Sequence, residues 1–446
     1  MITKDMTVGR PWKLLLTFSL PLIAGNIFQE LYSVVDTMIV GKFLGYQALA
    51  AVGVGGWITW MLLSTVQGLC QGFSVPVTNA FGSKDFAMIR KSILNSAFLS
   101  VVVSIVIAVG GQFILEPLLR LLDTPDSIMD MALTYLRIYY AGCPAIALYN
   151  FAAANLRAVG NSRSPLIAMI IASITNICLD LLFVGPFKWG IAGAVIATVI
   201  AQLVAAAYTL VCLSKYDFLK FSKEDIKISL SECKSLLLLG VPMALQNTVI
   251  SIGGLMVQFI MNQYGVIFIA GSTATGRLYG VIETAAISYG YALTTYVGQH
   301  KGAGLYKRIG QGIWAGHVVG YITAIIISLC MIFFGENLLS LFIEGTPEEI
   351  AAALEVAYRY LFIMSSFLPI LYSLHIFRSA VMGLGNGFFP LIAGFAELVM
   401  RVGASIIIPP IWGELNLFFA EPLAWAGNVV ISVIGYIYCM RKLKSE

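Results

Sequence analysis

Apolar residues along this chain form long runs, and few of them alternate with polar residues. Twelve stretches are long enough to cross a lipid bilayer as an α-helix, which needs about 20 mostly apolar residues. They are residues 12–40, 48–77, 91–115, 130–158, 164–187, 190–213, 236–263, 267–298, 309–335, 350–382, 389–412 and 418–440. Backbone polar groups cannot face lipid unpaired, and the runs lack the alternation of a membrane barrel. We therefore predict an all-α integral membrane protein with twelve transmembrane helices.

The same landmarks occur in both halves of the chain. The segment GNSRSPLIA at residues 160–168 and the segment GNGFFPLIA at residues 385–393 are identical at six of nine positions. Likewise, SLPLIAGN contains Pro21 where GVPMALQN contains Pro242, and Gly82 corresponds in the same way to Gly302. Collinear landmarks of this kind indicate an internal duplication.

Because six spans separate equivalent positions, the two copies should have the same orientation across the membrane. Such parallel repeats are related by an axis along the membrane normal. We expect a six-helix lobe at residues 1–213, a charged cytoplasmic linker at residues 214–235 and a second six-helix lobe at residues 236–446. Two bundles of this kind would suit alternating access.

Composition and charge agree with this map. The chain is 59% hydrophobic and 11% charged, which excludes a soluble globular protein. If the N-terminus is cytoplasmic, most of the 27 Lys and Arg residues fall on the inside, and only Lys42, Arg120 and Lys188 lie outside. The positive-inside rule then places both termini in the cytoplasm. The net charge of +4 reflects topology, and we expect no nucleic-acid partner.

Ionisable residues within a membrane span are costly, so each is a candidate for function. In the first stretch, polar residues fall within about a third of the helical circumference; they are Asn26, Gln29, Glu30, Ser33 and Asp36. We expect this polar stripe to face a cleft. The alternative is that these groups only form hydrogen bonds to neighbouring helices.

The fifth stretch places Asn176 and Asp180 at i and i+4, on one helical face. The sixth stretch adds Thr198. Together with Asp36, these oxygen-bearing side chains could bind a monovalent cation such as Na⁺, or the two carboxyl groups could share a proton. The residues themselves do not decide between Na⁺ and H⁺.

The second half differs in its charges. Its equivalent polar arc lacks an acid and consists of Asn247, Ser251, Gln258 and Asn262. Glu397 and Arg401 are spaced i, i+4 and predict an internal ion pair. Aromatic and Met residues are abundant in the spans and could form walls for bulky cations. No nucleotide-binding loop or catalytic constellation is recognisable, so we predict neither ATP-driven transport nor an enzyme.

Four segments carry a family resemblance: FSLPLIAGNIFQELYSVVDTMIVGKFLG, GFSVPVTNAFGSKD, LRAVGNSRSPL and NICLDLLFV. They resemble the multidrug and toxic compound extrusion (MATE) family, in its bacterial DinF-like branch. The resemblance implies twelve helices in two lobes, a bacterial inner-membrane location, and export of small amphiphilic organic cations in exchange for inward Na⁺ or H⁺. We expect no cofactor other than the coupling ion, and we expect a monomer whose partners are the organic cations, the coupling cation and membrane lipid.

The resemblance also implies site residues. The cation site corresponds to Asp36, Asn176, Asp180 and Thr198, and the resemblance gives Gln29 and Asn150 as residues of the substrate cavity. Among the other residues of the spans, we expect Asn26, Tyr32, Gln258 and Glu283 to line the same cavity. The tenth stretch departs from the branch that has acids in the second lobe, since it offers His375 and Arg378.

A related alternative function is a flippase for lipid-linked precursors, which shares the superfamily architecture. A flippase would need a strongly cationic cleft that holds pyrophosphate. In the first lobe the candidate cleft residues are acidic, which favours cationic cargo.

Overall fold

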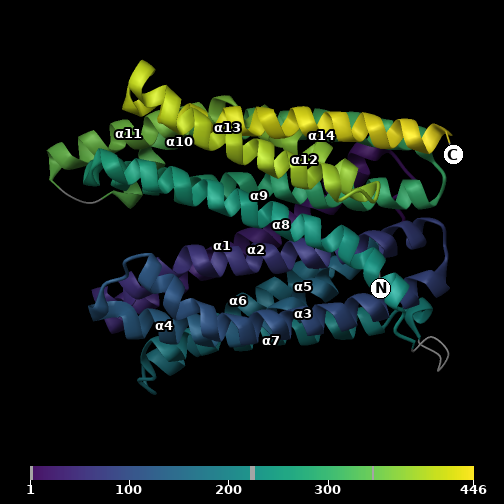
Figure 1. The fold of residues 1–446 in the computed structure, drawn as a ribbon, viewed down its shortest axis with the longest axis horizontal. Coiled ribbons are helices and arrows are strands. Elements are labelled where there is room, and N and C mark those ends of the chain that lie inside the picture. The colour runs from purple at the N-terminus through teal and green to yellow at the C-terminus, as the bar shows by residue number, and fades with distance from the viewer. Residues whose placement is uncertain (1–3, 221–226, 344–345, 446) are drawn as a thin grey trace. The chain divides into compact units, whose positions relative to one another are not determined.

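The computed structural model describes residues 4–220, 227–343 and 346–445, and these residues fold into α-helices joined by short turns (Figure 1). The α-helices are α1 (Pro11–Leu44), α2 (Tyr46–Gly82), α3 (Phe86–Leu121), α4 (Asp126–Ala141), α5 (Cys143–Ala158), α6 (Arg163–Val184), α7 (Gly190–Ser214), α8 (Leu230–Met261), α9 (Val266–Gly302), α10 (Tyr306–Leu339), α11 (Pro347–Ser366), α12 (Leu368–Gly383), α13 (Phe388–Trp412) and α14 (Ala420–Ser445). Short 3-10 helices occur at η1 (Asp217–Leu219), η2 (Asn262–Tyr264), η3 (Ser340–Phe342) and η4 (Glu414–Phe419).

Each of the twelve predicted stretches coincides with one helix or with one pair of helices. Within the described residues, nine helices are long and apolar enough to cross a membrane, and the bent pair α11–α12 makes a tenth. The other two predicted stretches correspond to the pair α4–α5 and to α9. Residues 221–226 of the predicted linker lie outside the described residues. Helix α8 begins at Leu230, within the last part of the predicted linker, and the linker bounds stay a prediction.

Two spans predicted as continuous helices are broken. The stretch 130–158 divides at Gly142, and the stretch 350–382 divides at Phe367, where the helix axes differ by 51°. In each case a proline, Pro144 or Pro369, occupies the first turn of the second helix. Proline lacks the N–H of the helical ladder and its ring clashes with the carbonyl four residues earlier. The breaks occur at equivalent positions of the two repeats.

The repeated segment that begins with Gly-Asn forms the same turn in both halves. Gly160 (φ 84°) and Gly385 (φ 80°) have left-handed backbone conformations just after α5 and α12. The asparagine that follows then accepts hydrogen bonds at the next helix: Asn161 Oδ1 from Arg163 N and Ser164 N, and Asn386 Oδ1 from Phe388 N and Phe389 N. Glycine tolerates the positive φ and asparagine satisfies free backbone donors, which explains the residue types of the repeat.

The described chain divides into two compact units, which we describe separately. Unit 1 contains residues 4–5 and the described residues between Leu20 and Ala244, whereas unit 2 contains Met6–Ser19 and residues 245–445. The first part of α1 therefore belongs to unit 2, and the first part of α8 belongs to unit 1. Both helices contain a proline near the changeover, Pro21 in α1 and Pro242 in α8. The lobe boundaries 1–213 and 236–446, which follow the sequence repeat, stay a prediction.

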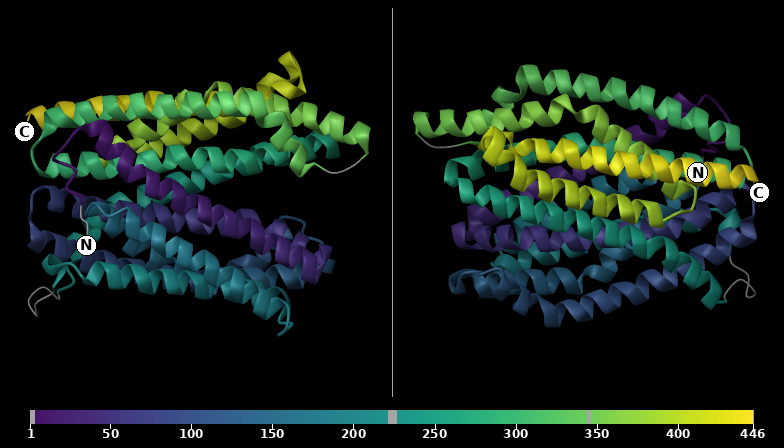
Figure 2. Two further views of the ribbon diagram at one scale, coloured as in Figure 1. Left: turned by 180° about the vertical axis from the view of Figure 1, so that it is seen from behind. Right: turned by 45° about the horizontal axis from the view of Figure 1, so that its top comes forward.

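Within each unit the helices pack along much of their length. In unit 1, α6 packs against α7, and a core of buried apolar residues joins α2, α3, α4 and α5. In unit 2, α13 and α14 lie side by side, as both figures of the ribbon show (Figures 1 and 2). Without a hydrophobic driving force between helices in lipid, close packing of small residues contributes much of the association.

The contact of α2 with α8 in unit 1 provides a test of this packing. A Cβ atom at Gly72 would lie 2.4 Å from the Cα atom of Gly240. Gly72→Ala should therefore lower the free energy of unfolding by about 1–3 kcal/mol, as overpacking does in other cores. Thermal unfolding of the purified protein in detergent would measure the loss.

Gly53 and Gly56 in the same helix are matched controls, because a Cβ atom there would meet nothing within 4 Å. Alanine at either position should leave stability unchanged or raise it slightly, since alanine is the better helix former. Equal stability of all three variants would contradict a tight α2–α8 contact.

Candidate functional site

The first acid of the candidate site lies on α1 where this helix packs against α6 in unit 1. The Ser173 hydroxyl of α6 donates a hydrogen bond to the Phe28 carbonyl oxygen of α1 over 3.2 Å. One turn earlier, a Cβ atom at Gly25 would lie 3.4 Å from the Cα atom of Leu166, so the two backbones approach closely. This packing places Asp36 against α6, and the Asp36 side chain is buried there.

The other members of the site lie on α6 and α7. Asn176 and Asp180 are both fully buried on α6. The Asn176 amide nitrogen donates to the Thr198 hydroxyl oxygen of α7 over 3.2 Å, and that hydroxyl donates to the Ala194 carbonyl oxygen over 3.3 Å. One N–H of Asn176 and the Thr198 hydroxyl are thus engaged in hydrogen bonds with α7.

Asp36 and Asp180 form a close pair. Their carboxyl groups interact directly across the α1–α6 contact, and such a contact becomes a hydrogen bond only when the two groups share a proton. Neither acid has an ion-pair partner within the described residues. Asp36 Oδ1, both Asp180 oxygens and Asn176 Oδ1 are buried and find no hydrogen-bond partner in the described part of the chain.

The site therefore contains several buried acceptor oxygens that no donor in the described residues satisfies. A buried polar atom without a partner is costly, and a buried charge much more so. A bound cation or a shared proton would satisfy these oxygens, whereas an anion would be repelled by them. The structure brings Asp36, Asn176, Asp180 and Thr198 together; their role as a cation site stays a prediction.

Additional side chains surround the acid pair. Tyr32 on α1 accepts a hydrogen bond from the Gln202 amide of α7 over 3.4 Å. The buried Tyr135 of α4 lies near enough to interact with the charges of both acids, and it stacks on Tyr139 one turn later. Neither Gln202 nor Tyr135 was among the residues predicted from the sequence. A tyrosine pair at i and i+4 is a signal that could have drawn attention to α4.

The residues expected to line a substrate cavity fall into both units. Asn26, Gln29, Tyr32 and Asn150 belong to unit 1, whereas Gln258 and Glu283 belong to unit 2. The buried Asn150 donates to the Ile146 carbonyl of its own helix, and Gln258 of α8 donates to Asn262 at the start of η2. These local hydrogen bonds are compatible with structural roles, so the cavity lining stays a prediction.

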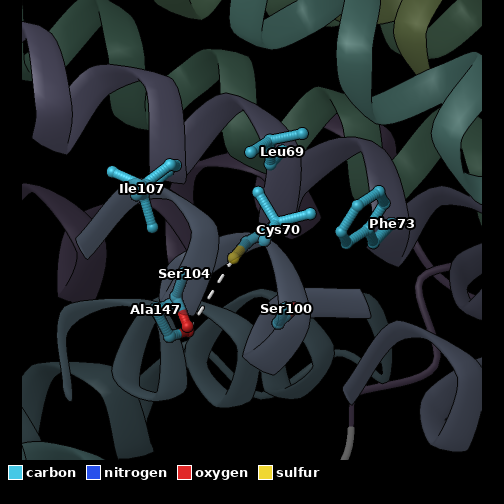
Figure 3. A pocket seen from close by; sticks show the side chains of 9 residues that line it. Leu69, Cys70, Phe73, Ser100, Ser104, Ile107 and Ala147 are labelled. Carbon is cyan, nitrogen blue, oxygen red and sulfur yellow. Dashed lines mark hydrogen bonds between the residues drawn. The ribbon is translucent and has the colours of Figure 1, made fainter. Parts of the chain in front are cut away.

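A small cavity in unit 1 is a different feature (Figure 3). It has a volume of about 10 Å³ and is lined by side chains of α2, α3 and α5 that include Cys70, Ser100 and Ser104. The Cys70 thiol points toward the Ala147 carbonyl oxygen, 3.8 Å away. A cavity of this size holds about one water molecule, so it is not a site for organic cargo.

Unit 2 contains a buried charge network on α13 and α14. The Arg401 guanidinium donates to Glu397 Oε1 over 2.8 Å and to Glu421 Oε2 over 2.9 Å. Asn428 donates to the second Glu397 oxygen, also over 2.8 Å. The predicted Glu397–Arg401 ion pair is confirmed, with a larger set of partners than the i, i+4 spacing indicates. The sequence analysis missed Glu421, because it lies at the start of a predicted span and on a different helix.

The fold and these buried sites define a class. The chain is a multi-span α-helical membrane protein with an internal repeat and with acidic residues inside its spans, and this combination is typical of secondary transporters.

Comparison with known proteins specifies the family. The family model described as MatE matches residues 21–182 and 242–407, so the two matches begin at the prolines that align in the repeat. A probable multidrug resistance protein, YpnP, from Bacillus subtilis (strain 168) is 33% identical over 347 residues, which cover 78% of each chain. A FAD transporter from Shewanella oneidensis is 26% identical over 335 residues, which cover 74% of each chain.

Solved structures share the fold. A crystal structure of MATE in complex with MaL6 has a TM-score of 0.91 and 22% identity, and covers 100% of both chains. An outward-facing multidrug resistance MATE family transporter of the MOP superfamily has a TM-score of 0.90 and 21% identity, and covers 100% of this chain and 99% of that chain.

The chain belongs to the MatE family. Its predicted fold class, an all-α membrane protein with twelve spans in two six-helix bundles, is confirmed. It is a multi-pass membrane transporter and not an enzyme.

Proposed function

We propose that this protein is a secondary antiporter that exports amphiphilic, mainly cationic organic compounds in exchange for inward Na⁺ or H⁺. The observation that carries the proposal is the cluster of buried oxygens of Asp36, Asn176 and Asp180, which find no hydrogen-bond donor in the described residues. Such a site gains stability when it takes up a cation or a proton. The names of several relatives, which describe probable multidrug resistance proteins, support the class of cargo.

Coupling requires that ion and cargo stabilise different conformations of the transporter. We propose alternating access of the two repeats as the conformational change. The inward ion would contribute about 2.3 kcal/mol per charge for each 100 mV of membrane potential. The excess of basic residues at one side of the predicted spans supports cytoplasmic termini in a bacterial inner membrane.

The cargo preference is tested in proteoliposomes that contain the purified protein. Sodium and proton gradients are imposed separately, and export of an ethidium-like cation is compared with export of an equally hydrophobic anion. Attraction by carboxylates and aromatic faces, worth about 1–2 kcal/mol, predicts roughly 5- to 30-fold faster export of the cation. The gradient that drives export identifies the coupling ion.

Preference for the anion would contradict the proposal and would support the flippase for lipid-linked precursors or a carrier of organic phosphates. Equal export with and without either gradient would contradict antiport. Liposomes without protein correct for passive leakage of the hydrophobic cation.

A further inference from the structure

Unit 2 holds a second group of ionisable side chains, on α9 and α12. His375 is 4% exposed, and its Nε2 atom lies 3.9 Å from Glu283 Oε1. The other ring nitrogen, Nδ1, lies 3.0 Å from the Arg378 guanidinium one turn later on the same helix. His375 Nε2 has no hydrogen-bond partner within the described residues, since 3.9 Å is too long for a hydrogen bond.

The Arg378 contact determines where the proton of His375 resides. A guanidinium has only N–H donors and keeps its charge in proteins, so Nδ1 must be the acceptor of this hydrogen bond. Neutral His375 therefore carries its proton on Nε2, the atom that faces Glu283. A second proton on Nδ1 cannot coexist with the Arg378 hydrogen bond, because two donors would then oppose each other.

The other two histidines of the chain have the opposite arrangement. His300 Nδ1 lies 2.8 Å from the Tyr296 carbonyl oxygen, and His317 Nδ1 lies 2.9 Å from the Ile313 carbonyl oxygen. A carbonyl oxygen only accepts, so both of these residues carry a proton on Nδ1. His375 is thus distinguished by its tautomer.

Among the ionisable groups around α12, carboxyl groups outnumber guanidinium groups by one. Arg401 is already engaged by Glu397 and Glu421, whereas Arg378 has no carboxylate within ion-pair distance in the described residues. On the helices packed against α12, the titratable or charged groups that interact with its side chains, with Glu283 or with one another include Tyr279, Glu283, Tyr289 and Tyr291 on α9, His317 and Tyr321 on α10, Tyr360 on α11, Glu397 and Arg401 on α13, and Glu421 and Tyr436 on α14. Among these groups and Arg378, the carboxyl groups of Glu283, Glu397 and Glu421 outnumber the two guanidinium groups by one, so one proton on His375 would bring their formal charge to zero.

We propose that His375, together with Glu283 and Arg378, is a proton-binding site of unit 2. Protonation of His375 replaces its hydrogen bond to Arg378 with an ion pair to Glu283. A hydronium ion transfers its proton to His375 Nδ1 and becomes water, and the new Nδ1–H displaces the Arg378 hydrogen bond. The resulting imidazolium pairs through its Nε2–H with the Glu283 carboxylate, and the Arg378 guanidinium is released. One O–H bond of hydronium breaks as the N–H bond forms, and the proton returns to a water molecule when the steps reverse.

This inference goes beyond the proposed function. The site consists of unit 2 residues alone, and it involves neither Asp36 nor Asp180. Its occupancy can be measured without cargo and without transport. If the protein proves not to be an antiporter, the proposal of a proton-binding site at His375 is unaffected. If His375 does not bind a proton, the antiport proposal is likewise unaffected.

The test is nuclear magnetic resonance of the full-length protein with ¹⁵N-labelled histidine rings, in lipid nanodiscs, between about pH 8.5 and pH 5.5, the range in which histidine titrates. Because the chain has three histidines, loss of one ring signal in His375→Gln assigns the residue. At high pH we expect His375 to show the Nε2–H tautomer and His300 and His317 to show the Nδ1–H tautomer. On acidification, His375 should become doubly protonated.

Two variants test the partners. Glu283→Gln should lower the ratio of protonated to neutral His375 at low pH about tenfold or more, because an opposite charge at this distance favours the imidazolium. Arg378→Gln should weaken the preference for the Nε2–H tautomer at high pH. His317→Gln is the matched control and should leave the His375 signals unchanged.

An Nδ1–H tautomer of His375 at high pH in the wild-type protein would overturn the proposal, and this measurement needs no variant to fold. An unchanged protonated fraction in Glu283→Gln would also overturn it. If His375 stayed neutral down to about pH 5.5, the Arg378–His375 hydrogen bond would be a permanent structural contact and the proposal would be wrong.

Discussion

Asp36→Asn and Asp180→Asn proteins are expected to insert and fold normally, yet to lose gradient-driven export. Asparagine keeps the size of the side chain and removes the charge that would bind the ion. The acids have no ion-pair partner in the described residues, so no opposite charge is stranded when either one is neutralised. With the coupling free energy removed, export should fall about 5- to 150-fold, the range that couplings of about 1–3 kcal/mol produce.

The measurement is cargo export from proteoliposomes under an imposed ion gradient, with protein content matched. Asp130→Asn is the control, because Asp130 lies exposed on α4 outside the site, and it should export at the wild-type rate. Glu397→Gln should have a milder effect than either site variant. Wild-type export by both site variants would show that the coupling site has been assigned to the wrong residues, and Glu283 would be the next candidate.

The second large effect is expected on stability, at Arg401 in unit 2. The side chain of Arg401 is 7% exposed, and those of Glu397 and Glu421 are 4% and 14% exposed. Arg401→Met would leave two buried acids without their cation. Removal of one partner from a buried ion pair costs about 3–5 kcal/mol, so the variant should unfold at a markedly lower temperature or fail to accumulate in the membrane.

Thermal unfolding in detergent provides the measurement. Arg359→Met is the matched control, because the Arg359 guanidinium is exposed and bonds to the Asn416 side chain. Addition of Glu397→Gln and Glu421→Gln to the Arg401→Met protein should recover part of the loss, since the stranded charges are then removed. Wild-type stability of Arg401→Met would mean that the network contributes nothing.

In the unit 1 site, the spacing of residues along one helix predicted part of the site, and contacts between helices supplied the rest. Asn176 and Asp180 were placed on one face by their i, i+4 spacing, which is a property of any α-helix. The contact of Asp180 with Asp36 depends on how α1 packs against α6, which the order of residues along either helix does not specify. The partners Gln202 and Tyr135 come from α7 and α4, where nothing in the local sequence marks them as neighbours of the acids.

In the unit 2 network as well, residue spacing predicted the contact within one helix and did not predict the contacts between helices. The spacing of Glu397 and Arg401 predicted their ion pair correctly, because both residues lie on α13. Glu421 and Asn428 complete the network from α14, and Glu283, His375 and Arg378 meet between α9 and α12. Which hydrogen bond fixes the tautomer of His375 is a matter of side-chain geometry and has no counterpart in the sequence pattern.

By itself, the sequence determined the membrane class, the twelve spans and the internal repeat. These follow from hydropathy, from the cost of unpaired backbone in lipid and from residue types such as the glycine and asparagine of the repeated turn, which are all local constraints. Only the tertiary structure decided where Pro144 and Pro369 break their helices, which parts of α1 and α8 join which unit, and which buried acids have partners. Those outcomes depend on packing between segments far apart in the chain, where each helix has several apolar faces of similar energy and only their mutual fit selects one arrangement.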